Sequence, residues 1–125
     1  MISRRLTLGV VDDDEDVRRA IERLLRAFGH SVHPFASAED FQAQRVPVDC
    51  LIVDVRLSGL SGFELEERLR LDGSPVPMVL ITADADIVAQ QNLNSIHLAL
   101  LSKPFDDERL IRAIDRAVSG FPRSS

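Results

Sequence analysis

The sequence predicts an α/β fold, with a five-stranded parallel sheet covered by helices on both faces. Five short apolar segments recur along the chain, and four of them are continuous apolar runs rather than alternating patterns. Continuous runs are typical of strands that are buried on both faces of a parallel sheet. Segments with helical periodicity separate the runs, and right-handed crossovers then place helices on both faces.

The predicted strands are all short and mostly apolar. They cover residues 6–11, 31–35, 50–55, 77–82 and 98–102. The second, SVHPF, is the weakest because it is the one segment that is not a continuous apolar run. In open α/β sheets ligands bind outside the carboxyl ends of the strands, so the residues that follow each strand need separate attention.

Helical patterns lie between and after these strands. Helices are predicted over residues 15–28, 62–72, 84–94 and 106–119, with a further short helix opening at Ser37. The first has an apolar stripe, acidic residues at its start and Gly29 after its end, as helix termini favour. Ser37 to Asp40 resembles a capping box. The segment 84–94 is the least convincing, because its apolar residues are few and QQNLN is polar.

Composition limits the classes of protein that the chain can belong to. Its 125 residues fit one domain, which we expect to span 1–125 with a core of about 5–120 and a frayed tail at 121–125. The net charge of −5 argues against direct nucleic-acid binding. No apolar run is long enough to span a membrane. Cys50, the only cysteine, excludes an intrachain disulfide and fits a cytoplasmic location.

Polar groups follow four of the five predicted strands. The first strand runs into Asp12 and Asp13, the third into Asp54, the fourth into Thr82 and the fifth into Lys103, the only lysine of the chain. Because parallel strands end at the same edge, these side chains are expected to converge there. Clustered carboxylates repel one another unless a cation intervenes, and oxygen ligands suit Mg²⁺. Such a site suits phosphoryl transfer, with an aspartate as nucleophile.

These features together resemble the receiver domain of two-component response regulators, over residues 5–120. The motifs are VVDDD (10–14), LIVDVRLSGLSGFEL (51–65), LITA (80–83) and SKPF (102–105), in the order and at the spacing of that family. The resemblance implies a flavodoxin-like, doubly wound sheet with strand order 2-1-3-4-5. A member of this family is a standard example of that order, which therefore follows from the resemblance and not from the residues alone.

The resemblance also implies a role for each residue at the strand ends. Asp54 would be the phosphoacceptor for a sensor histidine kinase or a phosphotransfer protein, while Thr82 and Lys103 would contact the phosphoryl group. Mg²⁺ would be held by Asp12, Asp13, Asp54 and the backbone carbonyl of Arg56. Lys103–Pro104 would be a cis peptide, and the small Ala83 would leave the acceptor accessible. The fourth helix, fifth strand and fifth helix would form the face for a homodimer or an output domain.

Several positions depart from the family pattern. Leu100 replaces the usual aromatic residue three positions before the lysine, which predicts a muted switch or simple core packing. The segment before the fifth strand lacks the common Gly-Ala step, so the fourth helix is expected to be shorter or tilted. Ser58 replaces a common proline and predicts a looser loop. Arg56 and Asp84 are expected to form an ion pair at the mouth of the site.

Two other functions remain open on sequence grounds. A haloacid-dehalogenase-like phosphatase also uses an aspartate nucleophile and Mg²⁺, but that class needs an acid or a threonine where this chain has Arg56. A receiver-like interaction module, with weak or no switching by phosphorylation, would agree with Leu100. The expected function is therefore a phosphoacceptor switch that catalyses only its own phosphoryl transfer and hydrolysis, with the interaction module as the alternative.

Overall fold

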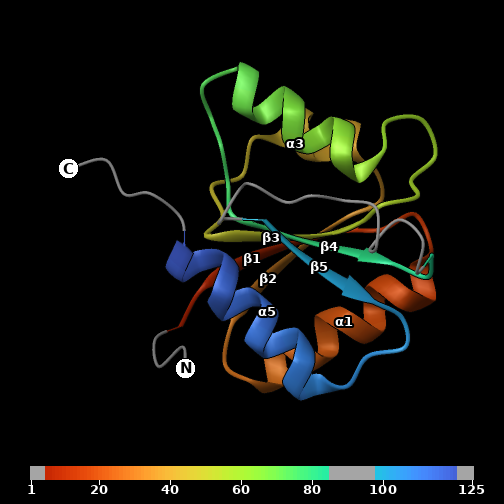
Figure 1. Cartoon of the computed structure of the whole chain (residues 1–125), viewed down its shortest axis with the longest axis vertical. Coiled ribbons are helices and arrows are strands. Elements are labelled where there is room, and N and C mark those ends of the chain that lie inside the picture. The colour runs from red at the N-terminus through yellow and green to blue at the C-terminus, as the bar shows by residue number, and fades with distance from the viewer. Residues whose placement is uncertain (1–4, 85–97, 121–125) are drawn as a thin grey trace.

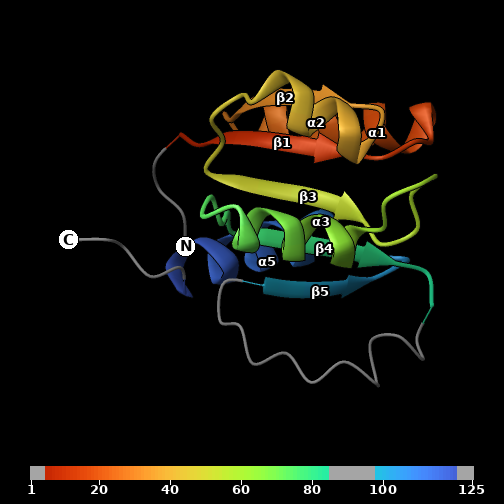
Figure 2. The ribbon, with the colours of Figure 1, turned by 90° about the horizontal axis from the view of Figure 1, so that it is seen from above.

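A central parallel sheet separates two layers of helices in the computed structural model, which describes residues 5–84 and 98–120. The strands are β1 (Thr7–Val11), β2 (Ser31–Phe35), β3 (Cys50–Asp54), β4 (Met78–Thr82) and β5 (Leu98–Ser102). They pair in parallel in the order β2-β1-β3-β4-β5, and Figure 2 shows their arrowheads at one end of the sheet. The predicted fold class and strand order are both confirmed.

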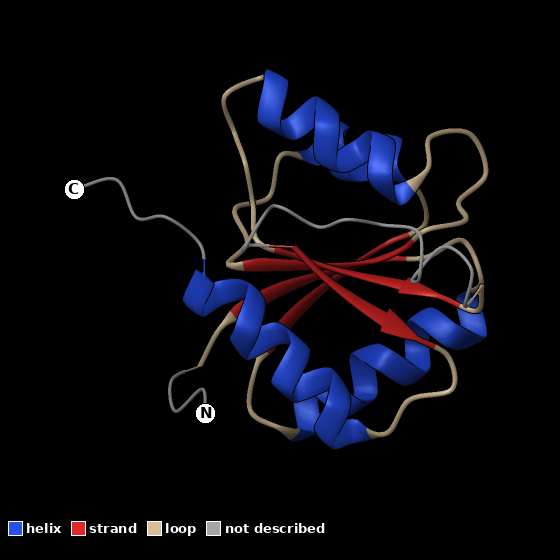
Figure 3. Ribbon diagram, in the orientation of Figure 1, coloured by secondary structure: helices blue, strands red, loops and turns tan. Residues whose placement is uncertain are grey.

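The helices are α1 (Glu15–Ala27), α2 (Ala38–Gln44), α3 (Gly62–Leu71) and α5 (Asp107–Gly120). Helices α1 and α5 lie on one face of the sheet, and α2 and α3 lie on the other (Figures 1 and 3). The predicted bounds of the described elements hold to within one residue at each end. The helix predicted at 84–94 falls almost entirely on 85–97, outside the described residues.

Alternating strand residues supply both layers of the core. Leu8, Val10, Ile52 and Ile81 face α1 and α5, where they pack with residues such as Leu25 and Ile114. Their neighbours Val11, Leu51, Val53 and Leu80 face α2 and α3, where they pack with residues such as Phe41 and Leu65. Because successive side chains point to opposite faces, a strand that is apolar throughout requires both layers.

Side-chain caps fix where the helices begin. Asp14 caps α1 by accepting hydrogen bonds from the backbone N–H groups of Asp16 and Val17, and Ser37 caps α2 through Asp40 N. A complete capping box, in which Ser61 and Glu64 bond each other's backbone, opens α3. The sequence pattern predicts such a box at Ser37 only. These caps set the directions in which the helices leave the loops at the strand ends.

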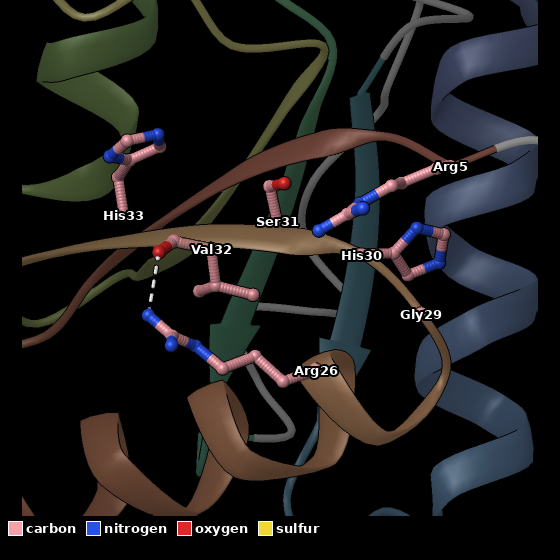
Figure 4. Close-up of a pocket in the computed structure, with 7 residues that line it drawn as sticks. All are labelled: Arg5, Arg26, Gly29, His30, Ser31, Val32 and His33. Carbon is pink, nitrogen blue, oxygen red and sulfur yellow. Dashed lines mark hydrogen bonds between the residues drawn. The ribbon is translucent and has the colours of Figure 1, made fainter.

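Strand β2 forms one edge of the sheet. The backbones of Ser31 and Phe35 form hydrogen bonds with the neighbouring chain at β1: Ser31 N donates to Leu6 O at 2.9 Å, and Asp12 N donates to Phe35 O at 3.2 Å. Val32 and Pro34, which alternate with them, therefore face the open edge. The Val32 carbonyl accepts a hydrogen bond from the Arg26 guanidinium at 3.0 Å (Figure 4), and Pro34 has no N–H to offer.

Candidate functional site

The carboxyl ends of β1, β3, β4 and β5 place the predicted site residues at one edge of the sheet. Strand β1 ends just before Asp12, β3 ends at Asp54, β4 ends at Thr82, and β5 ends just before Lys103. The register pairs Asp54 with Ile81 and Thr82 with Ser102, so neighbouring strands end nearly level. The sheet therefore presents a row of polar groups from strands that are mostly apolar up to that point.

Asp54 and Lys103 form an ion pair across this edge. Lys103 Nζ lies 3.4 Å from Asp54 Oδ2, and the side chains of Lys103 and Asp54 are 31% and 14% exposed, respectively. The other carboxylate oxygen, Asp54 Oδ1, accepts a hydrogen bond from Arg56 N at 2.9 Å. The Lys103–Pro104 peptide is cis, as predicted, and Lys103 N donates to Thr82 O at 2.8 Å. The backbone thus holds Lys103 against the end of β4, from where its ammonium reaches Asp54.

Asp12 is a nearly fully buried carboxylate, with 2% of its surface exposed. Burial raises its pKa from 3.8 to about 6, and the nearby Asp54 carboxylate acts in the same direction. The hydrogen bond that Asp14 N donates to Asp12 Oδ1, at 2.9 Å, and the charge of Lys103 lower the pKa without offsetting the burial. At neutral pH the site therefore carries negative charge that the Lys103 ammonium does not balance.

Asp13 points toward a different group. Its Oδ2 accepts two hydrogen bonds from Ser58, from the hydroxyl at 2.8 Å and from the backbone N–H at 3.1 Å. These bonds join the loop after β1 to the loop after β3. Proline at this position could donate neither bond, and the looser loop expected from its replacement by Ser58 stays a prediction. Ser58 ties the loop to the acidic edge.

Thr82 ends β4, which flanks β3 on the side opposite to β1 and its two aspartates, and the predicted Arg56–Asp84 ion pair lies nearby. Thr82 is buried, and its Oγ1 accepts a hydrogen bond from Asp84 N at 3.0 Å, which leaves the hydroxyl proton available as a donor. Arg56 Nη2 lies 3.2 Å from Asp84 Oδ2, so the ion pair predicted between them is present. The Arg56 side chain is 75% exposed, and a pair this exposed contributes only about 0–1 kcal/mol.

Two supporting residues were not predicted. The Arg18 guanidinium donates to the backbone carbonyl of Asp12 at 2.7 Å and so holds the acidic loop against α1. Gly62 begins α3 where the chain passes close to the site: a Cβ there would lie 2.9 Å from Leu80 Cδ2 and 3.0 Å from Asp54 O. A glycine in the loop after a strand is a signal that the sequence offers, whereas the reach of Arg18 emerges only from the fold.

A divalent cation fits this donor set. Within residues 5–84 and 98–120, no group of three or more His, Cys, Asp or Glu side chains is disposed to hold a metal ion. Mg²⁺, however, commonly binds proteins through one or two carboxylates together with water and phosphate oxygens. The Asp54 carboxylate is close enough to raise the pKa of Asp12, and the two side chains together supply such a pair. A cation beside the buried Asp12 would compensate the charge that burial disfavours.

A second basic region lies away from this edge, at the start of β2. Figure 4 shows a pocket of about 540 Å³ lined by residues that include Arg5, Arg26 and His30. Two of its polar side chains have partners beside it: Arg26 binds Glu22 at 2.8 Å, and His30 Nδ1 accepts from Leu6 N at 3.1 Å. Burial, together with the charge of Arg5, lowers the pKa of His30.

Leu100 lies on β5, half-buried against the apolar cluster between the sheet and α2 and α3. It packs like its apolar neighbours on that face, as one of the two sequence interpretations expected.

Among the described helices, none is both long and apolar enough to cross a membrane.

Comparisons with known proteins agree with this geometry. The family model for the response regulator receiver domain matches residues 8–115. The response regulator protein TodT of Pseudomonas putida is 32% identical over 98% of this chain and 56% of its own length. The transcriptional regulatory protein FixJ of Azorhizobium caulinodans is 35% identical over 87% of this chain and 53% of its own length. The chain thus spans about half the length of these relatives.

Solved structures give the same result. Full-length FixJ from B. japonicum superposes with a TM-score of 0.81 at 31% identity, over 94% of this chain and 59% of that one. The response regulator StyR superposes with a TM-score of 0.79 at 37% identity, over 90% of this chain and 59% of that one. The sequence resemblance is confirmed, and the phosphatase alternative is not supported. The chain belongs to the response regulator receiver domain family.

Proposed function

We propose that this receiver is a phosphoacceptor of a two-component system and that Asp54 takes a phosphoryl group from a histidine of a sensor kinase or of a phosphotransfer protein. The observation that carries the proposal is the position of Lys103, whose Nζ lies 3.4 Å from Asp54 Oδ2 at the carboxyl edge of the sheet. An aspartate that ends an apolar strand beside a single ammonium and a buried second carboxylate is arranged for phosphoryl transfer rather than for packing.

The proposed step exchanges one bond to phosphorus for another. A carboxylate oxygen of Asp54 attacks the phosphorus, an O–P bond forms, and the N–P bond to the donor histidine breaks. The bonding electrons leave with the imidazole, which takes a proton. Lys103 balances negative charge on the phosphoryl oxygens, and the buried Thr82 hydroxyl donates a hydrogen bond to one of them. Hydrolysis of the acyl phosphate restores Asp54.

We propose Mg²⁺ as the cofactor, held by Asp12, Asp13, Asp54 and the backbone carbonyl of Arg56. When bound, the ion supplies Lewis-acid compensation of charge on the phosphoryl oxygens. The buried Asp12 supports this assignment, because burial disfavours its charged form and a cation relieves that cost. The Arg56–Asp84 pair at the mouth is proposed to slow the entry of hydrolytic water.

The proposed partners follow from the family and from the length of the chain. The relatives are about twice as long, so we propose that the signal passes to an output domain, or to a second copy, through the face that includes β5 and α5. We place this exchange in the cytoplasm and assign nucleic-acid binding to no part of this acidic domain. The alternative, an interaction module with muted switching, is favoured by one observation: Leu100 packs against the core and lacks a ring that could turn.

Phosphorylation of the purified chain tests the proposal. The protein is incubated with a small-molecule phosphodonor, with MgCl₂ or with EDTA, and intact mass is measured. One phosphate should appear on the wild type but not on Asp54→Ala. It should also appear on Asp72→Asn, a control that lies near the amino ends of β3 and β4, away from the site. No adduct on the wild type, or equal adducts on wild type and Asp54→Ala, would reject the proposal. An equal adduct in EDTA would reject only the metal requirement.

A further inference from the structure

Ser58 makes a contact with Asp13 that the proposed chemistry does not use. Both donors of Ser58, the hydroxyl at 2.8 Å and the backbone N–H at 3.1 Å, end on the same carboxylate oxygen, Asp13 Oδ2. The contact spans 45 residues of sequence and lies on an exposed part of the edge. A carboxylate that accepts two donors from one residue is held in a defined orientation.

That orientation directs Asp13 Oδ2 at the loop after β3, because both of its hydrogen bonds come from Ser58. In the same part of the chain, residues 5–84 and 98–120, no three acidic, histidine or cysteine side chains form a metal-binding group. Asp13 therefore belongs to the edge by its position in sequence but is turned toward the loop after β3.

We propose that Ser58 is a positioning residue that holds Asp13 out of the coordination shell when no cation is bound, and thereby weakens Mg²⁺ binding. The inference rests on the proposed magnesium site. Binding of the cation through Asp13 Oδ2 requires this oxygen to leave the Ser58 hydroxyl, and the lost hydrogen bond opposes binding. Loss of the hydroxyl alone should tighten binding by about fivefold, the equivalent of one ordinary hydrogen bond.

The matched variants are Ser58→Ala and Ser58→Thr. Alanine removes the hydroxyl and keeps the backbone N–H, so it deletes one of the two bonds. Threonine keeps both donors and serves as the control for the change in side-chain volume. Ser58 is exposed and belongs to neither apolar cluster of the core, so both variants are expected to fold.

Magnesium affinity is measured directly, without phosphorylation. The chain has neither Trp nor Tyr, so backbone amides of ¹⁵N-labelled protein are followed by NMR during titration with MgCl₂, and a NaCl titration corrects for ionic strength. The expected result is an affinity about fivefold higher for Ser58→Ala and unchanged for Ser58→Thr. The Ser58 amide should shift on binding in the wild type.

The possible failures can be told apart. Equal or weaker Mg²⁺ binding by Ser58→Ala would overturn the inference, because Ser58 would then be neutral or would orient Asp13 toward the ion. In that case the phosphate adduct on Asp54 would still stand as evidence for the proposed function. A wild type that binds no Mg²⁺ in the millimolar range would overturn both the inference and the metal requirement.

Discussion

Asp12→Asn should stabilise the metal-free protein. Asn has nearly the same shape and keeps an oxygen that can accept the hydrogen bond from Asp14 N, but it carries no charge. Asp12 is 2% exposed, so the wild type holds a charge where solvation is poor. The substitution removes that charge and leaves the main contact intact.

The size of the effect follows from the pKa of Asp12. Burial raises it from 3.8 to about 6, a rise of about two units, and at about 1.36 kcal/mol per unit this corresponds to about 3 kcal/mol at neutral pH. The folded state binds the proton more tightly than the unfolded chain. The contribution of Asp12 to the free energy of unfolding therefore falls as pH rises from about 4 to about 6, and the deficit is complete above about pH 6.

Urea unfolding followed by far-UV circular dichroism, in EDTA between about pH 4 and 8, measures this difference. Asp12→Asn should be more stable than the wild type by about 2–3 kcal/mol at about pH 7, and the gain should vanish near about pH 4. Asp13→Asn is the matched control, because it makes the same charge change at an exposed neighbour and should change stability by only about 0.5 kcal/mol. If Asp12→Asn were no more stable than the wild type at neutral pH, the burial argument would be refuted.

Three further predictions concern other parts of the fold. Because burial lowers the pKa of His30, the unfolded chain takes up the proton first, so the contribution of His30 to stability should decrease as pH falls below about 6.5. Relative to the wild type, His30→Gln should therefore gain stability as pH falls through this range in the same urea assay, and a difference that does not change with pH would contradict it. Gly62→Ala should lower the free energy of unfolding, measured with urea, by about 1–3 kcal/mol, because the added Cβ would lie 3.0 Å from Asp54 O. An unchanged free energy of unfolding would mean that α3 shifts freely to make room. Asp84→Ala and Arg56→Ala should each shorten the lifetime of the phosphorylated form measurably, by no more than about fivefold, as followed by intact mass after donor removal. Unchanged lifetimes would exclude the water-slowing role.

The sequence was sufficient to predict the fold and where the candidate site residues gather. Continuous apolar strands that end in Asp12, Asp54 and Thr82 predict a shared edge, because parallel strands end together. The Lys103–Asp54 and Arg56–Asp84 pairs were also predictable, since each residue stands at or just beyond a strand end. These features depend on the order of the strands and little on how individual side chains turn.

Contacts made by loops were harder to predict. Ser58 stands where proline is common in the family, and on sequence grounds this difference suggests a less rigid loop. In the structure, Ser58 donates two hydrogen bonds to Asp13. The hydrogen bond from Arg18 to the Asp12 carbonyl joins positions six residues apart, which is not a spacing that a helix or strand pattern indicates. Such contacts depend on the path of a loop, and a serine or an arginine alone does not specify its partner.

The edge strand β2 has a consequence for how copies of this domain can meet. An unpaired strand edge usually offers backbone groups on which a strand of another molecule can extend the sheet. Here the Val32 carbonyl is occupied by Arg26, and Pro34 contributes no N–H. Of the four backbone groups that Val32 and Pro34 could direct to the open edge, one carbonyl is thus occupied and one N–H is lacking, so this side of the sheet is a poor template for an added strand when many copies are crowded together.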